Sequence, residues 1–274
     1  MADVMEFLAI AKAAAAAGAK VLAQRPAGSD GAGSLGVVNK GEAGDWVTAF
    51  DLAAEEAVRS SITSARPHDS ITGEEQGTAR PEQPSGYRWS IDPLDGTTNF
   101  IRNIVYYATS VAVADPDGVW LAGVVHAPAL GRVYSAARGQ GAWLEEGGRR
   151  TPLSGPLQGR TGLIVASGFS YDPATRAEQF AGLGKLMDGF ADLRRLGSAA
   201  LDLCLVADGT HDAFGERGLN EHDYAAGALI AEEAGCWVRR PRLTSPLDGG
   251  PSDADRLEAW TCAGTLELSG KFPL

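Results

Sequence analysis

The chain has 274 residues, 44% of them hydrophobic and 22% charged, a balance typical of a globular protein that buries its core without disulfides or a structural metal. The formal net charge of −11 argues against a general role in binding nucleic acid, which normally requires a basic face. The three cysteines lie far apart and form no Cys-x-x-Cys pair, so they indicate neither a zinc knuckle nor a disulfide framework.

The first half of the sequence predicts two helices followed by an antiparallel meander. Residues 1–24 form an Ala-rich amphipathic pattern, and Asp3 and Glu6 lie where a signal peptide would be positively charged. A polar, Gly-rich stretch over residues 26–44 predicts a mobile loop, and a second helix is expected from Thr48. Gly- and Asp-containing turns then separate strands predicted at residues 87–91, 106–114, 119–126 and 132–137.

The second half alternates strand-like and helix-like segments after a polar stretch rich in Gly and Pro over residues 145–159. Strands are predicted at residues 161–169, 191–197, 211–216, 236–240 and 257–264. Helices are predicted at residues 172–187, 198–209 and 223–235. Such alternation favours a layered α/β architecture, and we expect an N-terminal α+β half over residues 1–147 and a C-terminal α/β half over residues 148–274 in one integrated unit.

The cellular location is predicted from two negative features of the sequence. No segment is long and apolar enough to span a bilayer, and the cysteines are best explained as small apolar residues in a reducing compartment. We therefore expect a cytoplasmic protein with no membrane partner, in which most of the excess acid serves solubility.

Acidic residues gather at the predicted ends of elements, where side chains converge on a cleft. They are Asp51, Glu74, Asp92, Asp95 and Asp223. Crowded carboxylates repel and raise one another's pKa, and hard divalent cations remove this conflict. Carboxylates and backbone carbonyls suit magnesium, so the pattern favours a magnesium site. The alternative for any one of these residues is a helix N-cap or a solvated surface acid.

The stretch DPLDGTT over residues 92–98 follows directly on a predicted strand. Pro93 stiffens a turn in which Asp92 and Asp95 reach one centre. Gly96 and the two following threonines open a helix, whose unpaired N–H groups can bind an anion. A plain surface turn needs no more than Asp-Gly, so this stretch predicts a place for cations and an anion together.

Four motifs, DWVTAFD, GEE, DPLDGTTNF and HDYAAGALIAEEAG, occur in the order and approximate spacing of the inositol monophosphatase family, which the chain resembles from Lys40 through Gly235. That family belongs with the lithium-sensitive, magnesium-dependent phosphatases that include fructose-1,6-bisphosphatases. The resemblance implies an α/β (α+β) fold, a layered αβαβα sandwich. It also implies lithium inhibition and, because the family is commonly dimeric, a homodimer.

The resemblance assigns metal ligands residue by residue. Glu74, Asp92 and the carbonyl of Leu94 would hold a first Mg²⁺. Asp92, Asp95 and Asp223 would hold a second, with Asp92 bridging the two ions. Mn²⁺ is expected to substitute for Mg²⁺.

The resemblance also assigns the catalytic groups. Asp51 and Glu74 would manage the attacking water and a loosely held third ion, and the Thr97 hydroxyl would orient that water. The amides of Gly96 and Thr97 would bind the phosphate. The transition state of phosphoryl transfer is loose, so positioning and charge stabilisation replace a protein nucleophile.

The substrate pocket is assigned to the second half of the chain. Gly197, Ser198 and Ala199 match small family residues that approach the substrate ring. Glu216 matches an acidic residue that contacts sugar or inositol hydroxyls, or is a surface glutamate beside a turn. Arg194 and Arg195 are expected either to contact phosphate or to form structural ion pairs.

Two stretches depart from the family pattern. His222 stands where the family usually has Trp before the aspartate, and a lone His at a helix start is more often structural than catalytic. The neighbouring Asn220 and Glu221 are also unusual, so the sequence departs from the family pattern more in the substrate pocket than at the metal ligands. Lys40 matches a family loop residue only weakly.

The leading hypothesis is a Mg²⁺-dependent phosphomonoester hydrolase acting on a small polyol phosphate, most simply inositol 1-phosphate. Histidinol phosphate, fructose 1,6-bisphosphate and 3′-phosphoadenosine 5′-phosphate are rival substrates for the same chemistry. A protein that binds metal without turnover is the alternative from a different class. The Thr97 hydroxyl beside the carboxylates argues against it, because a passive metal site needs no group that orients water.

Overall fold

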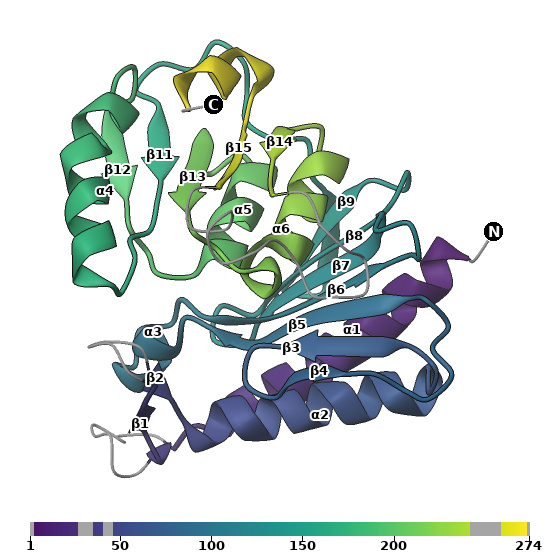
Figure 1. The fold of residues 1–274 in the computed structure, drawn as a ribbon. Helices are drawn as coiled ribbons and strands as arrows, with labels where there is room; N and C mark the ends of the chain where they lie inside the picture. Colours follow the sequence, from purple (N-terminus) through teal and green to yellow (C-terminus); the bar gives the residue numbers. More distant parts are fainter. Residues whose placement is uncertain (1–2, 27–34, 41–45, 242–258, 273–274) are drawn as a thin grey trace.

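The computed structural model describes residues 3–26, 35–40, 46–241 and 259–272. They form an αβαβα sandwich, which confirms the predicted fold class (Figure 1). In order, the layers are helices α1 and α2, an eight-stranded sheet, helices α5 and α6, a five-stranded sheet, and α4 together with the 3₁₀ helix η2.

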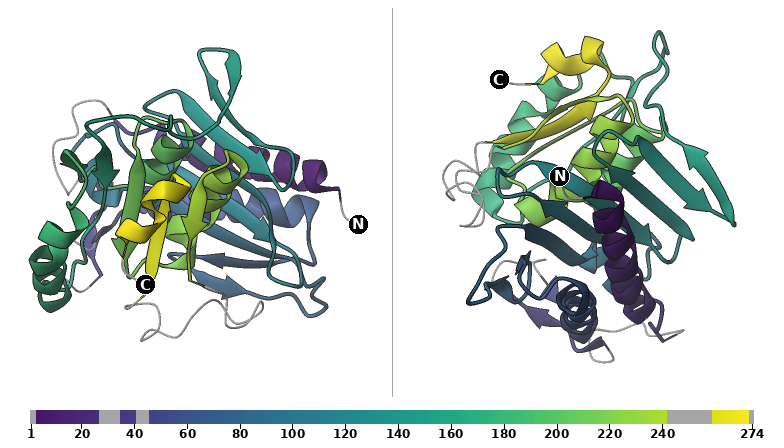
Figure 2. Two further views of the ribbon diagram at one scale, coloured as in Figure 1. Left: turned by 90° about the horizontal axis from the view of Figure 1, so that it is seen from above. Right: turned by 90° about the vertical axis from the view of Figure 1, so that its right-hand side faces the viewer.

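The two long helices predicted for the first half form the outermost layer. They are α1 (Val4–Leu22), capped by Asp3, and α2 (Ala49–Ala65), capped by Thr48. Both cover the same face of the eight-stranded sheet, and Figure 2 shows them from two further directions. Asp51, in the first turn of α2, accepts from the Thr48 backbone N–H and completes a capping box. The other oxygen of its carboxylate accepts from the Thr97 hydroxyl, so the start of this helix also positions a predicted site residue.

The eight-stranded sheet contains the predicted meander and runs in the order β10-β9-β8-β7-β6-β5-β3-β4. Its strands are β3 (Ser70–Gly73), β4 (Gly77–Ala79), β5 (Arg88–Asp95), β6 (Ala108–Ala114), β7 (Trp120–Ala127), β8 (Arg132–Ala137), β9 (Ala142–Glu146) and β10 (Arg149–Pro152). All neighbours are antiparallel except β3 and β5, which are parallel and therefore end at the same edge. This edge presents Glu74 and Asp92 to the cleft described below.

The sequence predicted a turn from Asp92 onward, and this prediction is wrong about the secondary structure. Strand β5 continues to Asp95 and is buried along its whole length. The register against β6 shifts between Asp92 and Asp95, which marks an irregularity inside the strand. Pro93 lacks an N–H for the ladder, which explains why the irregularity falls there. The Asp92 carboxylate accepts from the Leu94 N–H at 3.0 Å, so the strand is locally turn-like and brings both aspartates to one side.

The second half is built as predicted from alternating strands and helices. Its sheet runs β12-β11-β13-β15-β14, with β11 (Ile164–Ala166), β12 (Asp192–Arg194), β13 (Ala213–Arg217), β14 (Trp237–Arg239) and β15 (Trp260–Gly264). Helices α5 (Ala199–Ala207) and α6 (Glu221–Glu233) lie between the two sheets, and every residue of α5 is buried. On the outer face, α4 (Pro173–Leu186) and η2 (Leu266–Lys271) close a separate apolar cluster.

Smaller elements were not anticipated from the sequence. Strand β1 (Val38–Asn39) lies in the predicted Gly-rich loop and pairs with β2 (Trp46–Val47), which follows that loop. Residues 27–34 and 41–44 of the predicted loop lie outside the described residues. The β9–β10 hairpin spans the predicted boundary between the halves and belongs to the eight-stranded sheet. That boundary stays a prediction. Within the described ranges, no helix combines the length and the apolar character that crossing a membrane requires.

Candidate active site

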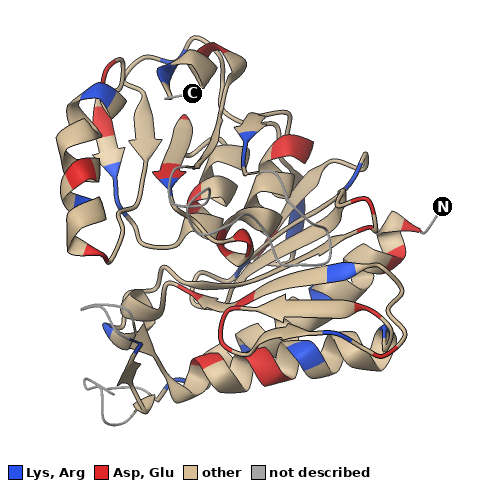
Figure 3. Cartoon of the chain, viewed as in Figure 1, with Lys and Arg blue, Asp and Glu red and all other residues tan. Residues whose placement is uncertain are grey.

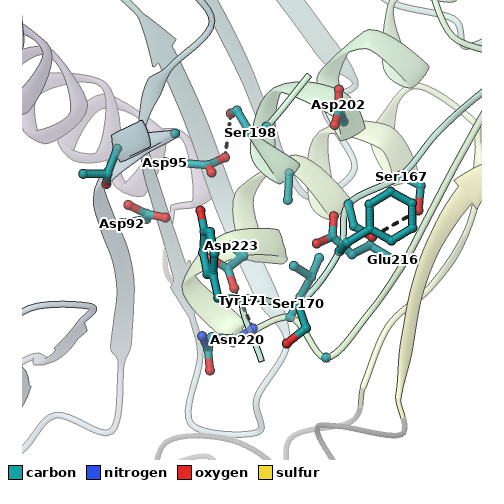
Figure 4. Close-up of a pocket in the computed structure, with 18 of the residues that line it drawn as sticks. Asp92, Asp95, Ser167, Ser170, Tyr171, Ser198, Asp202, Glu216, Asn220 and Asp223 are labelled. Carbon is teal, nitrogen blue, oxygen red and sulfur yellow. Dashed lines mark hydrogen bonds between the residues drawn. The ribbon is translucent and has the colours of Figure 1, made fainter. Parts of the chain in front are cut away.

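A cleft of about 440 Å³ lies where the end of β5, the short helix α3 (Thr97–Ile101), the starts of α5 and α6, and β13 meet. The predicted site residues that line it are Glu74, Asp92, Leu94, Asp95, Gly96, Thr97, Ser198, Ala199, Glu216 and Asp223. Asp51 is fully buried and lies next to Thr97, to which it is hydrogen-bonded. Figure 4 shows Asp92, Asp95 and Asp223 on one side of the cleft, with Glu216 and Ser167 on the other.

The acidic residues of the cleft perturb one another strongly. Asp92 is 1% exposed, and burial together with the charges of Glu74, Asp95 and Asp223 raises its pKa well above the ordinary value. Burial and the charge of Asp223 raise the pKa of Asp95 to about 7. Acidic positions occur on β5, α6 and β13, and Figure 3 marks the Asp and Glu positions along the chain. Carboxylates this close are destabilising unless a cation joins them.

Asp95 is held in place by the start of α5. Its Oδ2 accepts from the Ser198 hydroxyl and from the Ala200 N–H, both at 2.7 Å. Ser198, the N-cap of this helix, therefore fixes the orientation of Asp95 while also lining the cleft beside Ala199. These bonds occupy one carboxylate oxygen and leave the other oxygen of Asp95 as a ligand.

Glu74 follows β3 and forms an ion pair with Lys40. The Lys40 Nζ lies 2.9 Å from Glu74 and 2.6 Å from Glu75, and it lines the cleft, so the weakly matched loop lysine belongs to the site. Burial acts to raise the pKa of Glu74, but the nearby His222 and Lys40 hold it below the ordinary value. Glu74 is thus a ready acceptor for a cation.

The fully buried Asp51 forms a hydrogen bond with Thr97, which lines the cleft. The Thr97 Oγ1 lies 2.9 Å from Asp51 Oδ1 and 3.1 Å from the Leu94 carbonyl oxygen. Burial raises the pKa of Asp51 to about 6, although three hydrogen bonds from Thr48 and Thr97 favour its ionised form. Asp51 is therefore mainly ionised at neutral pH and can accept a hydrogen bond from the Thr97 hydroxyl.

Gly96 separates this pair from the loop before α5. It is the N-cap of α3 with φ of +101°, a conformation that L side chains rarely adopt. A Cβ at this position would lie 3.0 Å from the Tyr106 carbonyl oxygen and 3.3 Å from that of Gly197. Asn99 bonds the same loop through the Leu196 carbonyl at 2.8 Å. The glycine lets the first and second halves of the chain approach closely at the cleft.

Asp223 enters from the first turn of α6. Its Oδ2 accepts from the Asn220 N–H at 2.6 Å as part of a capping box. The neighbouring Glu221 forms a buried bidentate ion pair with Arg88 of β5, so α6 is tied to the strand that carries Asp92. This contact sets where Asp223 lies relative to β5.

Several polar residues lie at the far end of the cleft, and the sequence predicted only some of them. Burial raises the pKa of Glu216 to about 8, and the charge of Arg195 opposes the shift. Asp202, which we did not predict, also lines the cleft and accepts from the Tyr106 hydroxyl at 2.8 Å. The available signal was one acidic residue in the otherwise apolar run of α5. Arg194, in contrast, pairs with its neighbour Asp192, as the structural alternative proposed.

The donor set fits divalent metal ions. Four carboxylates and the Leu94 carbonyl line one wall of the cleft, and hard cations such as Mg²⁺ and Mn²⁺ prefer oxygen ligands of this kind. Burial and repulsion between the carboxylates raise the pKa values of Asp92 and Asp95, so a cation bound between them would stabilise their ionised forms. An αβαβα sandwich with such a cleft agrees with the class of layered phosphatases that the sequence resembles.

Comparison with known proteins narrows this class. The model of the inositol monophosphatase family matches residues 3–256. The chain is 41% identical over 222 residues to inositol-1-monophosphatase of Mycobacterium leprae, covering 80% of this chain and 76% of that protein. It is 39% identical over 195 residues to a protein named Nus factor SuhB of Pasteurella multocida, covering 71% of each.

Solved structures agree with the family match. The extragenic suppressor protein SuhB of Bartonella henselae has a TM-score of 0.81 at 30% identity, covering 96% of this chain and 95% of that one. Inositol monophosphatase from Anabaena (Nostoc) has a TM-score of 0.76 at 30% identity, covering 98% and 95%. The chain belongs to the inositol monophosphatase family.

Proposed function

We propose that this protein hydrolyses the phosphate monoester of a small polyol, most simply inositol 1-phosphate, with Mg²⁺ held by its acidic cleft. The observation that carries the proposal is the position of Asp92, Asp95 and Asp223 beside Thr97 and its hydrogen bond to the buried Asp51. A site that only bound cations would have no use for a hydroxyl directed by a buried carboxylate.

The proposed ligands are those that the family resemblance assigns. Glu74, Asp92 and the Leu94 carbonyl would hold one ion, and Asp92, Asp95 and Asp223 another. When bound, divalent cations would lower the pKa of a water molecule and neutralise charge on the attacking and leaving oxygens. Mg²⁺ is proposed because oxygen donors predominate, and Mn²⁺ is expected to replace it.

The Asp51–Thr97 pair would prepare the attacking water. Because the Thr97 proton points to Asp51 or to the Leu94 carbonyl, a lone pair of the Thr97 oxygen can accept a hydrogen bond from water in the cleft. As the water attacks phosphorus and the bond between phosphorus and the polyol oxygen breaks, a water proton would pass to the Thr97 oxygen and the Thr97 proton to Asp51, while the leaving polyol oxygen would take a proton from solvent. The amides at Gly96 and Thr97 line the cleft where the phosphate would bind.

The opposite end of the cleft supports a hydroxylated substrate. Glu216, with its pKa raised to about 8, carries a proton for much of the time at neutral pH and can both donate to and accept from a hydroxyl. Arg195 and Asp202 line the same end and add further polar groups. These residues are where inositol 1-phosphate, histidinol phosphate and fructose 1,6-bisphosphate would be distinguished.

The direct test measures phosphate release from inositol 1-phosphate with Mg²⁺, for the unmodified protein and for Asp92→Asn. The variant is expected to lose at least about 100-fold in kcat/KM, because several kcal/mol of charge stabilisation depends on that ligand. The matched control is Asp117→Asn, an exposed aspartate in the turn before β7, which should retain full activity.

Undiminished turnover in Asp92→Asn would reject the assigned site. A panel of the three esters, compared by kcat/KM, decides the substrate, and a preference for histidinol phosphate by orders of magnitude would remove the inositol assignment. Metal binding measured by calorimetry, with no hydrolysis of any ester, would favour the alternative of a binding protein without turnover.

A further inference from the structure

His222 lies closer to the acidic cluster than its place in the sequence suggested. One of its ring nitrogens, a carboxylate oxygen of Glu74 and one of Asp92 all lie within 4.8 Å of one another. Its Nε2 is also 3.6 Å from Asp223 Oδ1, and its side chain is only 14% exposed. The imidazole therefore shares the space in which the carboxylates converge.

Three separate segments of the chain build this arrangement. Glu74 follows β3, Asp92 lies in β5, and His222 is in the first turn of α6. The buried Arg88–Glu221 ion pair fixes that turn against β5, so the imidazole is held next to Asp92 by its neighbour in sequence. A side chain carried on an anchored helix turn is well placed to serve as a ligand.

The three donors form a mixed nitrogen and oxygen set. Mg²⁺ prefers oxygen ligands, whereas imidazole suits first-row transition ions such as Zn²⁺, and the affinity of a given site rises along the series from Mn²⁺ through Co²⁺. The other set, Asp92, Asp95 and Asp223, contains only carboxylates and suits Mg²⁺.

We propose that His222 is a metal ligand, and that the position shared by Glu74, Asp92 and His222 selects a first-row transition ion over Mg²⁺. The inference rests on the proposed function, because it refines which ion one of the two positions takes. The cleft would then hold two different cations, one in a nitrogen-containing position and one among carboxylates.

The test uses the full-length protein, freed of metal by a chelator and titrated separately with Co²⁺ and Mg²⁺ by calorimetry. Pulsed electron paramagnetic resonance of the Mn²⁺-loaded protein adds a reading of the ligand itself, because a coordinated imidazole gives a ¹⁴N coupling. The variant is His222→Gln, and the matched control is His68→Gln at an exposed histidine that is not among the residues lining the cleft.

We expect the ¹⁴N coupling in the unmodified protein and in His68→Gln, and its loss in His222→Gln. Affinity for Co²⁺ should fall at least about 10-fold in His222→Gln, since even outer partners of metal ligands contribute that much. Affinity for Mg²⁺ should change less than about 3-fold, because Mg²⁺ gains little from imidazole.

Two results would overturn the inference while leaving the proposed function intact. One is tight Mn²⁺ binding with no ¹⁴N coupling in the unmodified protein. The other is an equal loss of Co²⁺ and Mg²⁺ affinity in His222→Gln, which would make His222 a general support for the first turn of α6. If the unmodified protein binds none of these cations, the proposed function itself fails.

Discussion

Replacing Asp95 by Asn should make the metal-free protein more stable while destroying its activity. Asp95 is 9% exposed, and its carboxylate accepts from Ser198 and Ala200, bonds that an amide oxygen can also accept. Asn has nearly the same shape and carries no charge. The substitution therefore removes the cost of burying the Asp95 charge, together with its repulsion with Asp223 and Glu74, and keeps most of the packing.

The size of the effect follows from the pKa of Asp95, which is 3.8 ordinarily and about 7 in the folded protein. Between these values the folded state binds more protons than the unfolded state, so wild-type stability falls as pH rises. The full difference corresponds to about 4 kcal/mol above pH 7. Weaker hydrogen bonds to a neutral amide reduce this, and we expect Asp95→Asn to gain about 2–4 kcal/mol at pH 8 and almost nothing near pH 4.

The measurement is urea unfolding with excess chelator, from pH 4 to pH 8, for both proteins. A gain of 3 kcal/mol would raise the melting temperature by roughly 6–12 °C in a chain of this size. Saturating Mg²⁺ should reverse the order, because it stabilises the protein that retains all of its ligands more than the variant that has lost one. If metal-free Asp95→Asn is no more stable than wild type at pH 8, the carboxylates do not repel as described.

Two other substitutions test neighbouring parts of the site. Thr97→Val should lower kcat about 100-fold with KM little changed, because the hydroxyl that links water to Asp51 is lost. Thr97→Ser, which keeps a hydroxyl, is the control. An unchanged kcat for Thr97→Val in steady-state assays would refute proton transfer through Thr97. Arg88→Met should lower the free energy of unfolding by about 3–5 kcal/mol, because it leaves Glu221 buried and unpaired. The double variant Arg88→Met/Glu221→Leu should be more stable than either single one in urea unfolding, and strictly additive losses would contradict the pairing.

The sequence predicted the architecture well where local pattern is strong. The alternation of period-two and helical segments gave the meander, the three helices of the second half and the layered class. It failed at Asp92–Asp95, where a proline and a glycine indicated a turn although the chain continues as a strand. Tertiary pairing with β6 and burial on both faces outweighed the local turn signal.

The sequence by itself determined that acids gather at element ends, because the motif DPLDGTTNF places Asp92, Asp95 and Thr97 within a few residues. Only the tertiary structure decided what each acid meets: Ser198 on Asp95, Tyr106 on Asp202, and His222 beside Glu74. These partners are separated by about a hundred residues or more along the chain. Their meeting depends on how α5 and α6 pack between the two sheets, and no local pattern of residues encodes that packing.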